Sequence, residues 1–230
     1  MNFETFSLNN RTEVEQFDQM LSDYSSSQSN LGEGLLKGNL LAAYDHLQPR
    51  EDGGRVFTAY LDIVLNCYLI HIDLMKVGAT WNDKFSKGKL EGGSVLDSQA
   101  KFFGKMDLHR NFTSYVFRYR AIWDKIMGLS VLLQVPDEYD SYHSSKSKNK
   151  AFRKRAEKMA VVPAGDIKDF EGLLTEFDKT FRTPEAHGTG SIWKYNFTME
   201  SLSDTALVEL IGYWNFLLGE IKNLHELVMK

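Results

Sequence analysis

The sequence has little cysteine and proline and no pattern typical of β-strands. Its single cysteine, Cys67, excludes an internal disulfide and a cysteine-cluster metal site, and it lies in an apolar run where we expect a buried thiol. Only 4 prolines in 230 residues leave room for long uninterrupted helices. No segment alternates apolar and polar residues between turn pairs, and no repeat period is present. These absences favour an all-α protein in a reduced, cytoplasmic location.

The patterns of the common cofactor sites are missing as well. The 6 histidines are scattered, with no His-x-x-x-His or Glu-x-x-His pair on a helix face, so we predict no metal site. Neither Gly-x-x-x-x-Gly-Lys-Ser/Thr nor Gly-x-Gly-x-x-Gly after a strand occurs, which argues against a nucleotide phosphate cradle. A Ser-His-Asp triad stays open, although no nucleophile elbow is present. We therefore predict no cofactor.

Composition describes a globular chain. Hydrophobic residues make up 43% and charged residues 25%, and a chain of 230 residues can bury a core without disulfides. The net charge of −4 argues against a protein that coats nucleic acid with its whole surface. The first residues, MNFETFSLNN, lack the basic-then-apolar pattern of a signal peptide. We predict a single helical domain over 1–230, with an N-terminal extension over 1–11.

Apolar spacing predicts six or seven helices, several long and antiparallel. Thr12 is the expected N-cap of the first helix, because Glu15 follows three residues later. Glycines and lysines predict a long connection over 79–105, and a short acidic loop is expected after Pro136. The predicted helices cover residues 12–24, 35–47, 53–79, 108–133, 166–181 and 203–230, with a helix-like basic segment over 144–160.

The helix over 53–79 is apolar almost all round, as expected for a core helix. A membrane span is the competing interpretation, but Asp62, Asn66, His71 and Asp73 interrupt the apolar run, so we predict no membrane contact. A spacing of seven, four and seven places Arg55, Asp62, Asn66 and Asp73 on one narrow stripe. That stripe is either the solvent-facing edge of a buried helix or a polar network facing a cleft.

The basic segment concentrates positive charge in a chain of negative net charge. Glu157 is the one acid between its first and last cation. Lys and Arg contacts to phosphates supply most of the non-specific affinity for nucleic acid, which makes the segment a candidate RNA-binding surface. A solvated helix face is the alternative. The predicted phosphate-binding residues are Lys148, Lys150, Arg153, Lys154, Arg155 and Lys158.

The stretch RTPEAHGTG, residues 182–190, carries the densest chemistry of the chain. Pro184 disfavours the α conformation at the residue before it, so Arg182 is expected near a helix C-terminus and His187 just beyond it. A guanidinium can hold a phosphate through two hydrogen bonds, and an imidazole can move a proton near neutral pH. Together they make a minimal set of groups for metal-independent RNA cleavage. The alternative is structural, with Arg182 on the helix C-terminal carbonyls and His187 packed on Trp193.

An all-α chain with Arg, four residues and then His at a helix boundary resembles the HEPN superfamily. Thr183 supplies the polar residue that follows the arginine in that family, whereas Pro184 departs from a motif that continues along a helix. The resemblance implies a metal-independent ribonuclease, often a dimer that brings two motifs together. Arg182 would then neutralise the scissile phosphate, and His187 would assist attack by the ribose 2′-hydroxyl. The competing hypothesis is a non-catalytic helical module that binds a protein partner.

Overall fold

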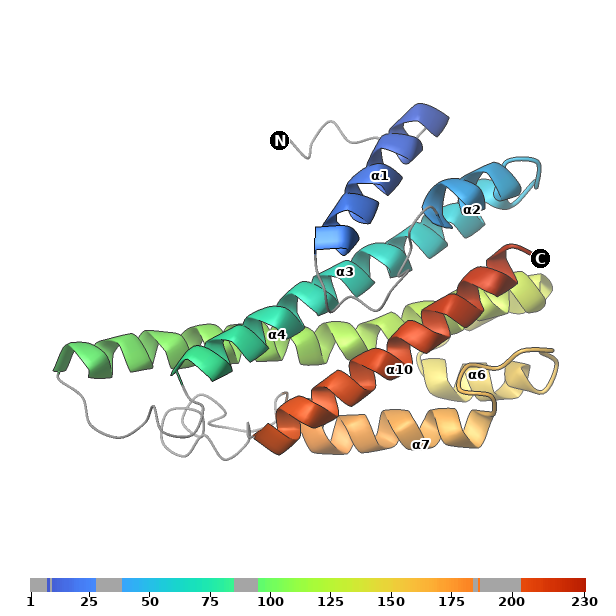
Figure 1. Cartoon of the computed structure of the whole chain (residues 1–230). Coiled ribbons are helices and arrows are strands. Elements are labelled where there is room, and N and C mark those ends of the chain that lie inside the picture. The colour runs from blue at the N-terminus through green and yellow to red at the C-terminus, as the bar shows by residue number, and fades with distance from the viewer. Residues whose placement is uncertain (1–7, 9, 28–38, 85–94, 184–185, 187–203) are drawn as a thin grey trace. The chain divides into compact units, whose positions relative to one another are not determined.

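The computed structural model describes residues 8, 10–27, 39–84, 95–183, 186 and 204–230. Of these described residues, 86% are helical and none forms a β-strand, which confirms the all-α prediction (Figure 1). The α-helices are α1 (Arg11–Ser27), α2 (Asn39–Leu47), α3 (Gly53–Lys84), α4 (Val95–Gln134), α5 (Tyr139–His143), α6 (Lys148–Ala156), α7 (Ile167–Phe177) and α10 (Asp204–Val228), with a 3-10 turn η2 (Pro136–Glu138) and a π-helical turn η3 (Asp178–Arg182).

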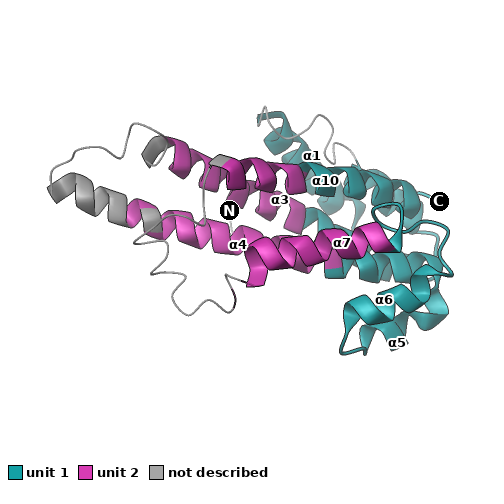
Figure 2. Ribbon diagram, turned by 90° about the horizontal axis from the view of Figure 1, so that it is seen from below, with its two compact units in different colours: residues 1–65, 124–167, 215–230 teal, residues 66–123, 168–214 magenta. Residues whose placement is uncertain are grey.

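The chain divides into two compact units, coloured teal and magenta in Figure 2. Each unit is assembled from segments that are separate in the sequence, and α3, α4 and α10 each contribute residues to both. The expected single domain over 1–230 stays a prediction. Unit 1 comprises Met1–Leu65, Asp124–Ile167 and Asn215–Lys230, and unit 2 comprises Asn66–Trp123 and Lys168–Trp214.

Helix α1 begins one residue earlier than expected and uses a different cap. The side-chain oxygen Oδ1 of Asn10 accepts a hydrogen bond from the backbone N–H of Glu13 at 3.0 Å. Asn10 is therefore the N-cap, because a cap side chain satisfies an N–H two or three residues into the first turn. The prediction of Thr12 was wrong, since Thr12 already lies inside the helix. Of the extension predicted over 1–11, the structure describes Leu8, Asn10 and Arg11, and Arg11 already lies in α1.

The long connection predicted over 79–105 was also wrong at both ends. Helix α3 continues to Lys84, and α4 begins at Val95. Val77 and Trp81 are both buried and lie four residues apart, so the buried face of α3 extends one turn further than the glycine and lysine content indicated. Residues 85–94 lie outside the described part of the chain.

Short helices occupy the segment expected to be an acidic loop after Pro136. The η2 turn leads into α5, which buries Tyr142 against α4. The ring lies 3.6 Å from the position that a Cβ on Gly128 would take, and the hydroxyl donates to the carbonyl of Asp124 at 3.4 Å. One buried aromatic thus fixes a segment too short to show helical periodicity.

The polar stripe of α3 forms contacts to other helices within each unit. Arg55 and Asp62 lie in unit 1, and Asp73 lies in unit 2. All three have a partner outside α3. The side chains of Arg55 and Asp62 are 54% and 50% exposed, as expected for a solvent-facing edge, whereas that of Asp73 is 13% exposed. The partners are Asp140 of α5 for Arg55 at 3.0 Å, Lys125 of α4 for Asp62, and Ser114 of α4 for Asp73 at 2.6 Å.

Aromatic side chains form the core of unit 2. The ring of Tyr119 on α4 lies 4.4 Å from Phe177, 5.6 Å from Tyr213 and 5.8 Å from Tyr115, centroid to centroid. The hydroxyls of Tyr115 and Tyr119 donate to the carbonyls of Leu210 and Tyr213 at 2.8 and 3.2 Å. Because both residue numbers rise together, α10 runs parallel to α4. This aromatic layer holds the elements of the candidate site in place.

Helix α3 also has the length and composition of a membrane-crossing helix. Among the described residues, Gly53–Asn82 contains a window of 18 residues with mean hydropathy 1.3. Half of that window is buried inside the structure. A core helix of a globular protein has the same properties, so the indication of a membrane span is weak.

Candidate functional site

Arg182 is the last residue of the π-helical turn η3, but the helical conformation does not stop there. Thr183 is helical, and so is Ala186 beyond the proline, so the helix end predicted before Pro184 was wrong. The backbone N–H of Thr183 donates to the carbonyl of Asp178, five residues earlier, which closes the wide turn. Thr183 keeps α-helical dihedral angles, φ −65° and ψ −45°, although a following proline disfavours them. Single π turns inside helices occur frequently at functional sites.

Asp178 contacts two arginines through the same carboxylate oxygen. Its Oδ2 accepts from Nη1 of Arg182 at 3.3 Å and from Nε of Arg120, on α4, at 3.4 Å. The side chains are 44% exposed for Arg182, 25% for Asp178 and 12% for Arg120. We refer to these three residues as the arginine–carboxylate cluster. Its positive groups thus range from a half-exposed guanidinium to a nearly buried one.

The aromatic core fixes the backbone positions of this cluster. Phe177 and Phe181 are buried directly beside Asp178 and Arg182 in the sequence. Phe181 packs edge-to-face against Phe112 of α4, with centroids 6.2 Å apart. Since neither phenylalanine can turn outward without exposing its ring, the turn holds Asp178 and Arg182 toward the edge of the core.

His187, the second predicted catalytic residue, lies outside the described residues, as does Trp193. Two histidines that the structure describes, His71 and His225, pack against aromatic rings. His71 is buried with its ring 5.4 Å from that of Trp214, and burial lowers the pKa of its imidazole. Nδ1 of His225 lies 3.0 Å from the hydroxyl of Tyr60, and burial likewise lowers its pKa.

Among the six predicted phosphate-binding residues, contacts within unit 1 hold Lys148, Arg155 and Lys158. Nζ of Lys148 donates to the carbonyls of Tyr142 and His143 at 3.2 and 2.5 Å, which satisfies the C-terminal end of α5. The guanidinium of Arg155 is buried, 5.9 Å from the ring of Tyr142. Lys158 pairs with the carboxylate of a glutamate in η2. These three residues stabilise the α5–α6 region.

That glutamate, Glu138, joins two of the three cations. Its Oε2 lies 3.3 Å from Nε of Arg155, and its Oε1 pairs with Lys158. The hydrogen bond from Lys158, with the nearby charge of Arg155, lowers the pKa of the Glu138 carboxyl. Arg155 is therefore a structural residue in this arrangement.

The other three predicted residues, Lys150, Arg153 and Lys154, are exposed on α6. Lys150 and Lys154 lie four residues apart, so their ammonium groups share one face of the helix. These three exposed residues stay candidates for a nucleic-acid surface, and so does Lys158, whose side chain is 60% exposed although it pairs with Glu138.

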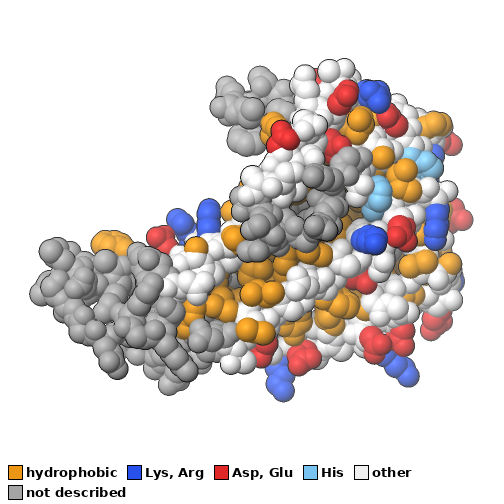
Figure 3. Space-filling model, viewed as in Figure 1, with side chains coloured by type: hydrophobic (Ala, Val, Ile, Leu, Met, Phe, Trp, Pro, Cys, Tyr) orange, Lys and Arg blue, Asp and Glu red, His pale blue; other side chains and the backbone are white. Residues whose placement is uncertain are grey.

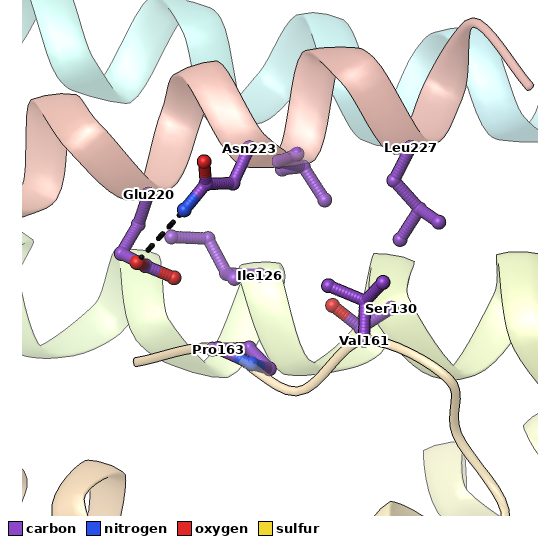
Figure 4. Close-up of a pocket in the computed structure, with 8 residues that line it drawn as sticks. Ile126, Ser130, Val161, Pro163, Glu220, Asn223 and Leu227 are labelled. Atoms are coloured by element: carbon purple, nitrogen blue, oxygen red, sulfur yellow. Dashed lines mark hydrogen bonds between the residues drawn. The ribbon is translucent and has the colours of Figure 1, made fainter. Parts of the chain in front are cut away.

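No group of three or more His, Cys, Asp or Glu side chains with metal-binding geometry occurs among the described residues. A pocket of about 20 Å³ in unit 1 has room for no more than a water molecule (Figure 4). In it, Nδ2 of Asn223 donates to Glu220 at 3.2 Å, and the second carboxylate oxygen of Glu220 accepts from the N–H of Ala164 at 3.0 Å.

Hydrophobic side chains are exposed on the helices of unit 2, and Figure 3 shows such side chains on one face of the molecule. On α4, Phe103, Met106 and Phe117 fall within one stripe of the helix surface. On α10, Val208 and Ile211 lie three residues apart on a common face. Exposed apolar side chains that gather on one face of a helix can form part of a surface that binds a partner.

The chain was compared with family models, curated proteins and solved structures. No match was found in any of the three. The site is therefore interpreted from its own geometry and from the sequence motif.

Sequence reasoning missed two members of the arginine–carboxylate cluster. Asp178 lies four residues before Arg182, a spacing at which helical side chains meet, so that pair was readable from the sequence. Arg120 is separated from Asp178 by 58 residues, and nothing in the local pattern indicates that they meet.

Proposed function

We propose that this chain is a cytoplasmic HEPN-like protein that binds RNA and cleaves it without a metal, with Arg182 and His187 as the reactive pair. The observation that carries the proposal is the half-exposed guanidinium of Arg182 at the end of a π turn, with His187 following after four intervening residues. The turn is anchored by buried aromatics, so the guanidinium starts from a defined backbone position. A preorganised cation is the group that phosphoryl chemistry requires.

In the proposed reaction, the ribose 2′-oxygen forms a bond to phosphorus and the bond from phosphorus to the 5′-oxygen breaks. Arg182 offsets the negative charge that develops on the non-bridging oxygens. His187 either takes the proton of the 2′-hydroxyl or gives a proton to the leaving 5′-oxygen, and solvent water serves the other of these two transfers. The products are a 2′,3′-cyclic phosphate and a free 5′-hydroxyl, and no redox partner or metal is needed.

Lys150, Arg153 and Lys154 are the proposed phosphate contacts that add sequence-independent affinity. Each phosphate contact on a single strand contributes a slope of about −0.7 in the logarithmic dependence of affinity on salt. Neutralising both Lys150 and Lys154 should therefore flatten that slope by about 1.4 and weaken RNA binding at low salt. Lys168 and Lys222, on α7 and α10, supply a matched pair of lysine substitutions outside the proposed surface.

The test of catalysis is incubation of the full chain with single-stranded and structured RNA in excess chelator. We expect cleavage that falls about 100-fold or more in His187→Ala and Arg182→Ala. His143→Ala and Arg110→Ala remove the same side-chain types at exposed positions and serve as controls. An RNA with a 2′-deoxy nucleotide at the cleaved position should be inert. Equal cleavage by His187→Ala and the parent protein would refute the proposed pair.

The resemblance also supports a homodimer that brings two motifs together. Light scattering on the full chain at several protein concentrations tests this, and cleavage that rises with the square of concentration in the dimerising range supports it. A monomer at every concentration that retains full cleavage would exclude the dimeric site.

A second candidate is a non-catalytic module that binds a protein partner through the exposed apolar side chains of unit 2. Its supporting observation is the stripe of Phe103, Met106 and Phe117 on α4. Under this hypothesis, Phe117→Ser abolishes partner binding, while Arg182→Ala and His187→Ala leave it unchanged. Cleavage and partner binding can thus be separated by substitutions in the same unit.

A further inference from the structure

In the arginine–carboxylate cluster, the two carboxylate oxygens of Asp178 differ in their hydrogen bonds. Asp178 accepts both arginines on Oδ2, at 3.3 and 3.4 Å. Its Oδ1 is buried and has no hydrogen-bond partner within the described part of the chain. Charge-assisted N–H···O bonds are normally about 2.7–2.9 Å long, so both contacts are looser than the usual pairing.

We propose that Asp178 is an internal competitor of the substrate phosphodiester for Arg182, and that Arg120 holds the carboxylate while Arg182 exchanges partners. The inference rests on the proposed function, since it concerns the same RNA site. Asp178 occupies the guanidinium that would otherwise bind a phosphate. The incoming phosphodiester carries one negative charge, as the carboxylate does, and its oxygens accept hydrogen bonds in the same way.

Arg120 lowers the free-energy cost of this exchange of partners. Leaving a partly buried carboxylate without any neighbouring cation would strongly destabilise the protein. Because Arg120 is only 12% exposed and extends from the core helix α4, it stays beside Asp178 when the half-exposed Arg182 turns away. Asp178 therefore keeps one cation throughout. Arg120 and Asp178 are positioning residues in this scheme, and neither touches the RNA.

The Asp178→Asn substitution separates this role from a purely structural one. Removing the charge frees Arg182, so a short 2′-O-methyl RNA, which cannot be cleaved, should bind about fivefold more tightly. A structural role predicts the opposite, weaker binding by a less ordered turn. Glu176→Gln is the matched control, because it removes the same charge from an exposed position two residues away. We expect it to change the affinity less than about twofold.

The pair of arginines gives a second test that does not depend on the first. With Arg120→Gln, Arg182 is left as the remaining cation of Asp178, so RNA binding should weaken about threefold. In the double variant Arg120→Gln, Asp178→Asn the competitor is gone, and affinity should return to within about twofold of Asp178→Asn alone. An equal weakening by Arg120→Gln in both backgrounds would overturn the proposed role of Arg120.

The experiment is fluorescence anisotropy on the full chain, with all variants and Arg182→Ala titrated in parallel. If Arg182→Ala loses affinity while Asp178→Asn and Glu176→Gln behave alike, the competitor role is refuted and the proposed function stands. If the parent protein and Arg182→Ala bind equally, or none of the proteins binds, both are overturned. Thermal melts of each variant identify a loss of binding that comes from unfolding.

Discussion

Substituting Asp18 by alanine should destabilise unit 1 more than any exposed acidic change on the same helix. Asp18 is 6% exposed on α1, and its Oδ1 accepts from the backbone N–H of Leu40 at 3.1 Å, with a further hydrogen bond from the N–H of Leu41. It thus caps α2 from a different helix. Loss of a cap costs about 1 kcal/mol, and leaving a buried N–H unsatisfied adds about 1–3 kcal/mol. We expect a loss of about 2–4 kcal/mol in the free energy of unfolding.

Asparagine at the same position should behave differently from alanine. Burial raises the pKa of the Asp18 carboxyl above its ordinary value of 3.8. The hydrogen bonds from Leu40 and Leu41 act in the opposite direction, and the net shift is upward. A carboxyl that binds protons more tightly when folded contributes its stability below pH 3.8, and that contribution is lost as pH rises through the raised pKa. The asparagine side chain keeps an oxygen as acceptor and has no charge to bury. Asp18→Asn should therefore be at least as stable as the parent protein at pH 7, with its advantage shrinking in acid.

Urea unfolding followed by circular dichroism at pH 7 and near pH 4 measures both effects. Asp23→Ala, an exposed acidic substitution on α1, is the control and should change the unfolding free energy by less than about 0.5 kcal/mol. The reasoning fails if Asp18→Ala costs no more than Asp23→Ala. It also fails if Asp18→Asn is as destabilising as Asp18→Ala at pH 7, because the cap would then depend on charge rather than on the acceptor.

Three further perturbations have directions fixed by the structure. A Cβ at Gly53 would lie 1.9 Å from the carbonyl oxygen of Leu47, so Gly53→Ala should lower the unfolding free energy by about 1–3 kcal/mol in a urea titration. Ala164 has a φ of 62°, a left-handed conformation that carries a steric penalty for alanine and none for glycine. Ala164→Gly should therefore raise the melting temperature, and an unchanged or lower melting temperature would contradict the argument. Cys67 is buried, and burial raises the pKa of its thiol. An aromatic disulfide reagent should therefore react with the native protein only as fast as local unfolding exposes the thiol. Rapid labelling of the folded protein at pH 8 would contradict this.

Long amphipathic helices were predictable because their periodicity reflects a single buried face. In the helix predicted over 166–181, Phe170, Leu174, Phe177 and Phe181 are all buried. Their spacing of four, three and four residues describes one side of a helix, whatever that side packs against. The sequence showed no sign of the π turn that widens the last part of this helix.

Elements that depend on one distant contact were not predictable. The five residues of α5 are too few for periodicity, and Tyr142 is buried because of the surface that α4 offers it. The basic segment illustrates the same limit for function. Charge counting treats Lys150 and Arg155 alike, whereas the first is exposed and the second is buried beside Glu138. Only the tertiary partner distinguishes them.

Because each unit combines segments that are separate in the sequence, neither unit can finish folding early in synthesis. Unit 1 draws on Met1–Leu65 and also on Asn215–Lys230, so most of the chain must leave the ribosome before that unit is complete. Unit 2 is nested inside this interval and needs Lys168–Trp214. Neither unit corresponds to a contiguous stretch of the gene, so neither can be excised, swapped or expressed as an independent fragment. We therefore expect limited proteolysis to yield nicked, associated pieces rather than a stable subdomain.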